Sequence, residues 1–304
     1  MLKKALLSLK ERNDSFHDEN QYLNLIQDIL NEGIIENTRN GFTKAVFGSA
    51  MHFSLEDNKI PLMTTKKLAW KTCLKELLWF INGSTDNSKL VENNVKIWND
   101  NATPEFKKSR GLFYEYDEDL GPIYGHQWRH FNAKYKDCKT DYTGKGVDQL
   151  QSIINSLSHP TEKFSRRLIM SAWNPCQIDE MALPPCHVLT QFNVNSKNEL
   201  SCLLFQRSGD VGLGIPFNIA SYAMLTHILA RHCNLEPDKL IHFIGDAHIY
   251  ENHVEPLKQQ IIRPNYSMPT IQINKKNSIN DYEFDDIKIK NYKYHPTIKM
   301  DMIA

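Results

Sequence analysis

Apolar side chains recur along the first half of the chain with two distinct periods. Between residues 21 and 31 they lie three or four positions apart, which predicts a helix that ends at Gly33. Residues 45–55 alternate instead, with Met51, Phe53 and Leu55 on one side, and this pattern predicts a strand. Residues 68–81 are apolar on nearly every face, as in a deeply buried helix, and residues 147–157 show the pattern of an amphipathic helix.

Strand patterns dominate the second half of the chain. They cover residues 165–173, 188–194, 200–206 and 240–244, and one long helix is predicted over residues 218–233. We also expect a polar loop at residues 37–44, a charged surface insertion at 99–120 and short strands from residue 271 onward. No repeat or break in composition divides the chain. We therefore expect one α+β domain over residues 1–304, with a mixed sheet packed by helices and residues 1–20 as an N-terminal extension.

Composition and charge narrow the class of protein. Lys and Arg number 36 and Asp and Glu number 36, so the basic excess typical of proteins that coat nucleic acid is missing. No run of about 18 apolar residues indicates a membrane span. Lys10, Glu11 and Arg12 interrupt the first apolar stretch, which favours a short surface helix over a signal peptide. The six cysteines form no C-x-x-C pair, so we expect reduced thiols in a cytoplasmic protein.

One cysteine stands in an unusual setting, in the stretch MALPPCHVLTQFN. Pro184 and Pro185 hold the chain extended, and the residues after Cys186 alternate as in a strand. Cys186 is therefore expected at a rigid entrance to a strand, where a nucleophile can be fixed in place. A buried core position is the common alternative for a free cysteine, and it is the position that we expect for Cys202 and Cys233.

A nucleophilic cysteine needs a positive neighbour, and the planar fork of arginine matches a phosphate group well. The candidates are Arg39 in the polar loop, Arg166 and Arg167 at the start of a strand, and Arg207 at the end of another. The sequence SGDVGLG after Arg207 adds the Ser208 hydroxyl and glycines at which the backbone can approach a ligand. Each arginine taken alone could equally be a solvated surface charge.

Spacing disfavours other chemistries. Cys186 and His187 are adjacent and so point to opposite faces of a strand, which argues against a protease-like dyad. His248 and His253 are five residues apart, off the i, i+4 register of a zinc-binding helix, and no third ligand is obvious. The GLG pair lacks the strand–G-x-G-x-x-G–helix setting of a dinucleotide site. We therefore expect no metal.

Three motifs, PPCH, QRSGDVGLGIPFNIASY and GDAHIYENH, together resemble the thymidylate synthase family, close to its eukaryotic form. The stretches KELLWFINGST, NNVKIW, DLGPIYGHQWRHF, RRLIMSAWNP and IKMDMIA extend the resemblance from about residue 22 to the last residue. It implies reductive methylation of dUMP to dTMP, with 5,10-methylenetetrahydrofolate supplying carbon and hydride and with no metal or nicotinamide. It also implies a homodimer in which two sheets pack against each other.

The resemblance implies a catalytic role for each matched residue. Cys186 would be the thiolate that adds to uracil C6, with Arg207 keeping it ionised. Asn218 would read uracil O4 and N3–H, because its amide both donates and accepts. Glu76 would act through water, and Tyr124 would belong to the network that removes the C5 proton. The implied catalytic set is Cys186, Glu76, Tyr124, Asn218, Arg207 and Asp210.

Binding roles follow from the same resemblance. Arg166 and Arg167 would reach the phosphate from the partner subunit, and residues 298–304 would close over the ligands. His187 and Gln206 would support the ligand-contacting residues from behind. The implied dUMP contacts are Arg39, Arg166, Arg167, Gln206, Arg207, Ser208, Asp210, Asn218, His248 and Tyr250. The implied folate contacts are Trp98, Asp210, Leu213, Gly214, Phe217 and Ala304.

Two positions depart from the family pattern. The loop after Arg39 reads NGFTK and is one residue shorter than the family's R-T-G-T-G-T, with Lys44 as a further positive charge. The chain ends Ile303-Ala304, where the family has Ala-Val.

Two other functions share parts of this pattern. A dUMP or dCMP hydroxymethylase would use the same thiolate addition and then let water capture the methylene group. Asn218 argues against the dCMP form, and Trp98 with the closing tail argues for hydride transfer. A catalytically idle homologue that binds nucleotide or RNA is the third hypothesis, and intact Cys186, Glu76 and Tyr124 argue against it.

Overall fold

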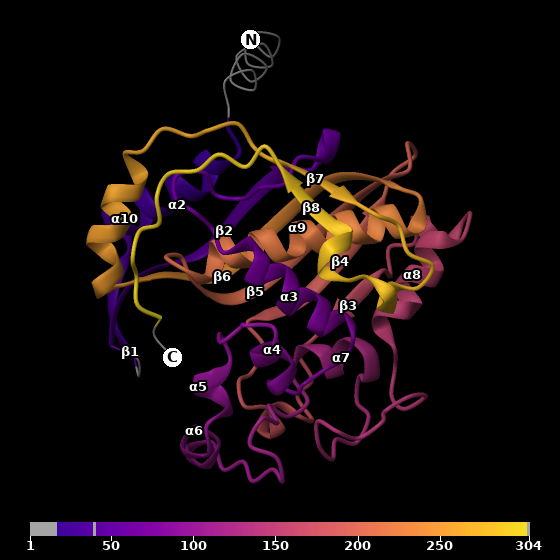
Figure 1. The fold of residues 1–304 in the computed structure, drawn as a ribbon. Coiled ribbons are helices and arrows are strands. Elements are labelled where there is room, and N and C mark those ends of the chain that lie inside the picture. The colour runs from indigo at the N-terminus through magenta and orange to yellow at the C-terminus, as the bar shows by residue number, and fades with distance from the viewer. Residues whose placement is uncertain (1–16, 39–40, 303–304) are drawn as a thin grey trace.

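A six-stranded mixed sheet forms the centre of the molecule (Figure 1). The computed structural model describes residues 17–38 and 41–302. The strand order is β1-β2-β6-β5-β4-β3, and among these neighbours only β5 and β6 run parallel. The strands are β1 Ile34–Thr38, β2 Gly41–Ser54, β3 Ile169–Ser171, β4 His187–Val194, β5 Glu199–Asp210 and β6 Glu236–Tyr250. The expected α+β class with a mixed sheet is confirmed.

Helices pack against this sheet, and the short ones α4 to α7 gather at one end of the molecule (Figure 1). A separate hairpin, β7 Thr270–Ile273 and β8 Ile287–Lys290, lies in the C-terminal part. No helix in the described ranges is long and apolar enough to cross a membrane. The helices are α2 Glu19–Glu32, α3 Trp70–Ile81, α4 Ser88–Glu92, α5 Asn99–Ala102, α6 Pro104–Ser109, α7 Tyr124–His130, α8 Gln149–Ser158, α9 Gly214–Cys233 and α10 Val254–Ile261.

The helix α9 is the core of the fold. It packs against β5 and β6 on one side and against α3 on the other. Its residues are buried around almost the whole circumference, which explains why its sequence shows no polar stripe. The helix ends at Asn234, whose left-handed conformation (φ 56°) is typical of a helix C-terminus. Tyr222, Cys202 and Cys233 are buried here, as expected from the sequence.

The opposite face of the sheet carries exposed apolar side chains. Phe205 and Phe243 are direct partners across β5 and β6, so they lie on the same face, and they are 42% and 40% exposed. Ile169 lies on this face too. Its partner on β4 and the β4 partner of Phe205 are two residues apart, and residues two apart on a strand share a face. Ile169 is 43% exposed. Phe47 on the neighbouring strand β2 is 88% exposed. Large aromatic surface of this kind usually marks an interaction site.

Most predicted elements are present with shifted ends. The first predicted helix is α2, and the Gly33 N–H caps it by binding the Ile29 carbonyl. The apolar segment at 68–81 is α3, buried as expected. Strands β5 and β6 are longer than their apolar runs, because β5 continues through the polar residues 207–210 and β6 begins at Glu236. The surface helix predicted near residue 10 lies outside the described residues.

Other expectations were wrong. The loop expected at 37–44 is wrong for residues 37–38 and 41–44, which belong to the paired strands β1 and β2. The Thr38 hydroxyl also donates to the Gly41 carbonyl, so polar residues that read as a loop take part in strand pairing. The predicted strand at 165–173 shrinks to β3, and Val147 is 56% exposed, outside α8. The insertion at 99–120 contains the helices α5 and α6.

Two side chains of α2 attach this helix to the segments that build the site. Glu19 is fully buried and accepts hydrogen bonds from the backbone N–H and hydroxyl groups of Thr64 and Thr65. Tyr22 donates its hydroxyl to the Val211 carbonyl at 2.9 Å, just after β5. A buried carboxylate is tolerated here because four donors replace its water.

We expect Glu19→Ala to lower the free energy of unfolding by at least about 2 kcal/mol, because it leaves buried donors without partners. Glu32→Ala, at the exposed end of the same helix, is the matched control and should change it by less than about 0.5 kcal/mol. Urea unfolding of both variants at one protein concentration measures the difference. Equal unfolding midpoints would contradict the role of Glu19.

Candidate active site

Cys186 lies at the entrance to β4 and is fixed from two sides. Its backbone N–H donates to the Tyr124 hydroxyl at 2.8 Å, and its carbonyl accepts from the Arg207 N–H at 2.9 Å. The β4–β5 register shifts directly after it, between His187 and Leu189. Its side chain is partly exposed, whereas Cys73 is buried. Cys186 is therefore a held and accessible thiol, as its sequence setting predicted.

Arg207 braces the turn that carries this cysteine. Its Nε donates to the Pro185 carbonyl at 2.9 Å and one terminal nitrogen donates to the Pro184 carbonyl at 3.1 Å. Its guanidinium lies 5.7 Å from the ring centre of Trp173, in cation–π range. Because proline carbonyls have no strand partner here, the side chain from β5 satisfies them. The same contacts place a permanent positive charge beside the residues that precede Cys186.

Tyr124 joins Cys186 to the aromatic core. It is the first residue of α7, and its ring lies 4.8 Å from Phe80, 5.1 Å from His187 and 6.2 Å from Trp98, between centroids. Burial raises the pKa of Tyr124 well above its ordinary value, and the nearby Cys186 raises it further. Tyr124 is therefore a neutral phenol that accepts one hydrogen bond and keeps its own proton for donation.

Glu76 is the buried carboxyl of α3. Trp98 donates its indole N–H to Oε1 of Glu76 at 2.7 Å. Burial raises the pKa of Glu76 from 4.5 to about 7, although the Trp98 hydrogen bond acts in the opposite direction. A carboxyl group with this pKa exchanges a proton readily near neutral pH, as a general acid or base must.

A chain of amide and imidazole groups orients Asn218. Gln206 donates to Oδ1 of Asn218 at 2.9 Å and accepts from Nε2 of His242 at 2.9 Å. Since Oδ1 of Asn218 accepts this bond, the rotation of its amide is fixed. Burial lowers the pKa of His187 to about 4 and that of His242 to about 3, so both rings are neutral. Gln206 also binds the Ser208 carbonyl at 2.9 Å, which supports the neighbouring backbone.

Asp210 ends β5 and organises the glycine-rich turn that leads into α9. It accepts from the backbone N–H groups of Gly212 at 2.8 Å and Leu213 at 3.1 Å, and it faces His253 at 3.3 Å. Burial raises the pKa of Asp210, yet the bond to His253 and its charge outweigh burial, so the pKa lies below its ordinary value. A Cβ added at Gly214 would make ordinary van der Waals contacts, 3.8 Å from the Asp210 side chain and 3.9 Å from Oδ1 of Asn218.

The remaining predicted contacts divide into two groups. His248 binds the Asp246 carboxylate at 2.6 Å and lies 5.2 Å from the Tyr250 ring, on the strand beside Ser208. Leu213 and Phe217 are partly exposed, in and just after the glycine-rich turn that follows Asp210. Arg166 and Arg167 are exposed beside β3. Arg39 and Ala304 lie outside the described residues.

The ammonium group of Lys44 donates to the Leu30 carbonyl near the end of α2. The two histidines considered as a metal pair bind different carboxylates. His248 binds Asp246, and His253 binds Asp210. No group of three metal-ligating side chains occurs among residues 17–38 and 41–302.

The sequence did not predict three side chains that support the site. Trp173 lies under Arg207, His242 holds Gln206, and Lys66 donates its buried ammonium to the Gly212 carbonyl. Lys66 sits in the motif-poor stretch before α3, where the one available signal is a lysine between buried threonines and the apolar helix.

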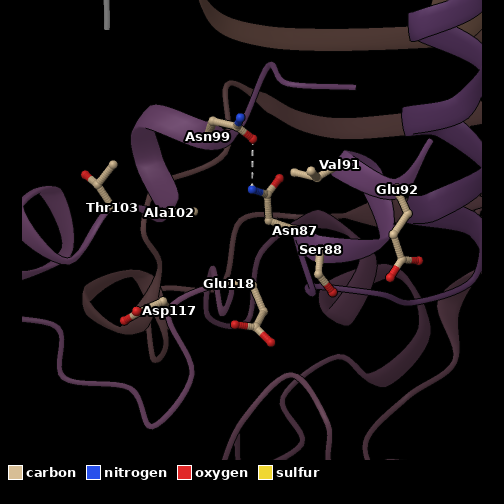
Figure 2. Close-up of a pocket in the computed structure, with 9 residues that line it drawn as sticks. All are labelled: Asn87, Ser88, Val91, Glu92, Asn99, Ala102, Thr103, Asp117 and Glu118. Carbon is tan, nitrogen blue, oxygen red and sulfur yellow. Dashed lines mark hydrogen bonds between the residues drawn. The ribbon is translucent and has the colours of Figure 1, made fainter. Parts of the chain in front are cut away.

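A surface hollow of about 470 Å³ lies elsewhere, between α4, α5 and the loop before α7 (Figure 2). Asn87 donates to Asn99 across it at 3.1 Å, and Glu118 and Asp117 line its lower edge in this view. It contains none of the predicted site residues, so it is no part of the Cys186 site.

Comparison with known proteins gives a consistent result. A family model described as thymidylate synthase matches residues 20–304. The thymidylate synthase of Homo sapiens is 51% identical over 94% of this chain and 91% of its own length. The bifunctional dihydrofolate reductase-thymidylate synthases of Paramecium tetraurelia and Leishmania major are 49% and 48% identical. The matches cover 95% and 94% of this chain but 62% and 55% of those two relatives.

The raised pKa of Glu76 predicts a pH-dependent cost in stability. Between about pH 4.5 and pH 7 the folded protein holds a proton that the unfolded chain has lost, so the stability of the wild type falls as the pH rises. Glu76→Gln removes this cost. At about pH 8 it should raise the free energy of unfolding by up to about 3 kcal/mol, and near pH 4 the gain should vanish.

Urea unfolding at several pH values measures this difference, with exposed Glu105→Gln as the matched control. A stability difference between wild type and Glu76→Gln that does not change with pH would contradict the assigned pKa.

Proposed function

The chain belongs to the thymidylate synthase family, and on that premise we propose that it converts dUMP to dTMP with 5,10-methylenetetrahydrofolate as donor of carbon and hydride. Cys186 is the nucleophile. The observation that carries the proposal is the unbroken series of contacts from Glu76 through Trp98 and Tyr124 to Cys186. These contacts join an acid–base group, two aromatic rings and a held thiol into one connected series, which supports the proposal.

The reaction begins with addition of the Cys186 thiolate to uracil C6. The sulfur–carbon bond forms, and the electron pair of the C5–C6 double bond moves to O4 as an enolate. C5 then attacks the methylene carbon of the folate, and one of the two carbon–nitrogen bonds of that carbon breaks. Loss of the C5 proton, breakage of the second carbon–nitrogen bond to release the folate and hydride transfer from the folate give a methyl group and dihydrofolate. Finally the C6–sulfur bond breaks and Cys186 leaves as a thiolate.

Glu76 and Tyr124 supply the proton transfers. The pKa of Glu76, about 7, allows it to hold or release a proton near neutral pH, and in this role it acts through water on O4 and the folate nitrogen. Tyr124 keeps its phenolic proton and accepts the Cys186 N–H, so it can fix a water beside C5 for removal of the C5 proton. The indole N–H of Trp98 orients the Glu76 carboxyl next to the folate.

Asn218 selects uracil over cytosine. Its Oδ1 accepts from Gln206, which fixes the amide so that it presents both a donor and an acceptor to O4 and N3–H of the base. Gln206 lies behind it, and His248 and Tyr250 contact the deoxyribose. Asp210 and the turn through Leu213, with Gly214 and Phe217, hold the folate ring.

We propose that the active unit is a homodimer formed through the exposed face of the sheet. Phe205, Phe243 and Ile169 supply the apolar surface of that face. Arg166 and Arg167 are exposed beside β3, at one edge of the same sheet, and they reach the phosphate bound by the partner subunit. In its own subunit Arg207 is joined at the phosphate by Ser208 and Arg39. A monomer would therefore lack half of the phosphate site.

The proposed organisation is one catalytic domain with residues 1–20 as an N-terminal extension. We place the protein in the cytoplasm, since the six cysteines, which all lie within the described residues, form no disulfide in the structure. The activity proposed here concerns this chain alone, which spans about three-fifths or less of the bifunctional relatives.

Product analysis with dUMP and 5,10-methylenetetrahydrofolate tests the reaction. We expect dTMP and dihydrofolate in equal amounts. Cys186→Ser should remove turnover by at least about a thousandfold, because a serine hydroxyl is a far weaker nucleophile, while changing the Kd for dUMP by less than about threefold. Calorimetry measures the Kd. Release of tetrahydrofolate with 5-hydroxymethyl-dUMP would instead identify a hydroxymethylase.

Mixed dimers test the shared site. Cys186→Ser and the double variant Arg166→Ala/Arg167→Ala should each be inactive alone. When they are coexpressed, half of the dimers combine the two chains and each of these has one intact site, so about a quarter of the wild-type activity should return. Activity no higher than the sum of the separate variants would show that the arginines act within their own subunit.

A further inference from the structure

His253 connects the glycine-rich turn to the C-terminal tail. It ends the short 3-10 helix Glu251–His253 and its side chain is fully buried. Its Nδ1 lies 3.3 Å from Oδ1 of Asp210, and its Nε2 lies 2.7 Å from the backbone carbonyl of Asp301. One imidazole ring therefore bridges two segments that are 91 residues apart, the end of β5 and the described end of the chain.

Both partners of this ring are acceptors. The Asp301 group is a carbonyl oxygen, and the Asp210 group is a carboxylate that already accepts the Gly212 and Leu213 N–H groups. A neutral imidazole carries a single N–H and could satisfy only one of them. The imidazolium form carries two. The geometry thus requires both nitrogens to be protonated when the tail is in this position.

The charges around the ring act in both directions. Asp210 favours the imidazolium, and the buried ammonium group of Lys66, which binds the Gly212 carbonyl, disfavours it. His248 lies close enough to act on Asp210, and the Tyr250 ring lies 5.7 Å from His253. Burial lowers the pKa of His253, but the bonds to Asp210 and to the Asp301 carbonyl outweigh it, so the pKa lies above its ordinary value.

The ring of His253 packs against the glycine-rich turn. An added Cβ on Gly212 would lie 2.6 Å from Nδ1 of His253, so the ring packs directly on the glycine backbone. Five residues before Asp301, the tail is also held by Arg263, which donates to the Pro296 carbonyl at 2.7 Å. His253 is the contact that ties the last described residues to the site turn.

We propose that His253, as an imidazolium, is a positioning residue that holds the C-terminal tail against the folate site and orients Asp210. This inference rests on the proposed function for its effect on folate, but the tail contact itself does not. Folate affinity should therefore depend on the protonation of His253, whereas dUMP affinity should not. As the pH rises through the pKa of His253 in the folded protein, one of the two bonds is lost and the tail loosens.

The first measurement uses the wild-type protein without ligands. Nitrogen-15 NMR of the His253 ring at about pH 6.5 should show both nitrogens protonated. Hydrogen exchange at residues 296–302 should accelerate about tenfold on passing from about pH 6 to about pH 9, beyond the intrinsic change with pH. A neutral ring throughout this range would overturn the proposal, whatever reaction the enzyme catalyses.

The second measurement compares His253→Gln with exposed His159→Gln. Glutamine can reach only one of the two acceptors, so the KM for the folate should rise about tenfold and lose its pH dependence, with kcat and the Kd for dUMP within about threefold. His159→Gln should match the wild type.

The two proposals fail in different ways. Equal folate KM values in wild type and His253→Gln would overturn the role of His253, and an inactive wild type with a normal His253 signal would overturn the proposed reaction alone. If His253→Gln does not fold, the ring signal and tail exchange of the wild type still decide the question.

Discussion

The hydrogen bonds between the Arg207 guanidinium and the two proline carbonyls are the interaction on which the site depends. Proline cannot pair its backbone as a strand residue does, so the approach to β4 would otherwise be unsupported. Arg207 comes from β5, the neighbouring strand, and it fixes this approach while bringing a permanent charge. The Tyr124 hydroxyl completes the support at the Cys186 N–H. Fold and reactivity are coupled because the groups that hold the turn also surround the thiol.

The titratable groups of the site fall into two sets. Around Cys186 burial moves them toward their neutral forms, with the pKa of Glu76 about 7, that of His187 about 4, and that of Tyr124 well above its ordinary value. Around the glycine-rich turn the mutual attraction of Asp210 and His253 outweighs burial, and the pair is stabilised in its charged forms. A neutral set suits proton transfer on a pyrimidine ring. A charged set suits recognition of a polar ligand and attachment of the tail.

The sequence could predict the parts whose cause is local. Proline before Cys186, an all-apolar α3 around Glu76, and the α9 pattern each act through nearby residues, and each was placed correctly. The pairing of β1 with the first residues of β2 was read as a loop because the paired residues 36–38 and 41–44 are mostly polar, so no apolar alternation marks them. The supports of the site, Trp173, His242 and Lys66, were missed because their partners are distant along the chain.

The central claim is that Cys186 forms the covalent bond to the pyrimidine. Incubation with 5-fluoro-dUMP and 5,10-methylenetetrahydrofolate, followed by digestion and mass spectrometry, tests it directly, because fluorine at C5 prevents the proton loss that normally frees the enzyme. The account predicts that both ligands remain attached to the peptide that contains Cys186. Absence of the adduct, or its attachment to another cysteine such as the exposed Cys176, would contradict it.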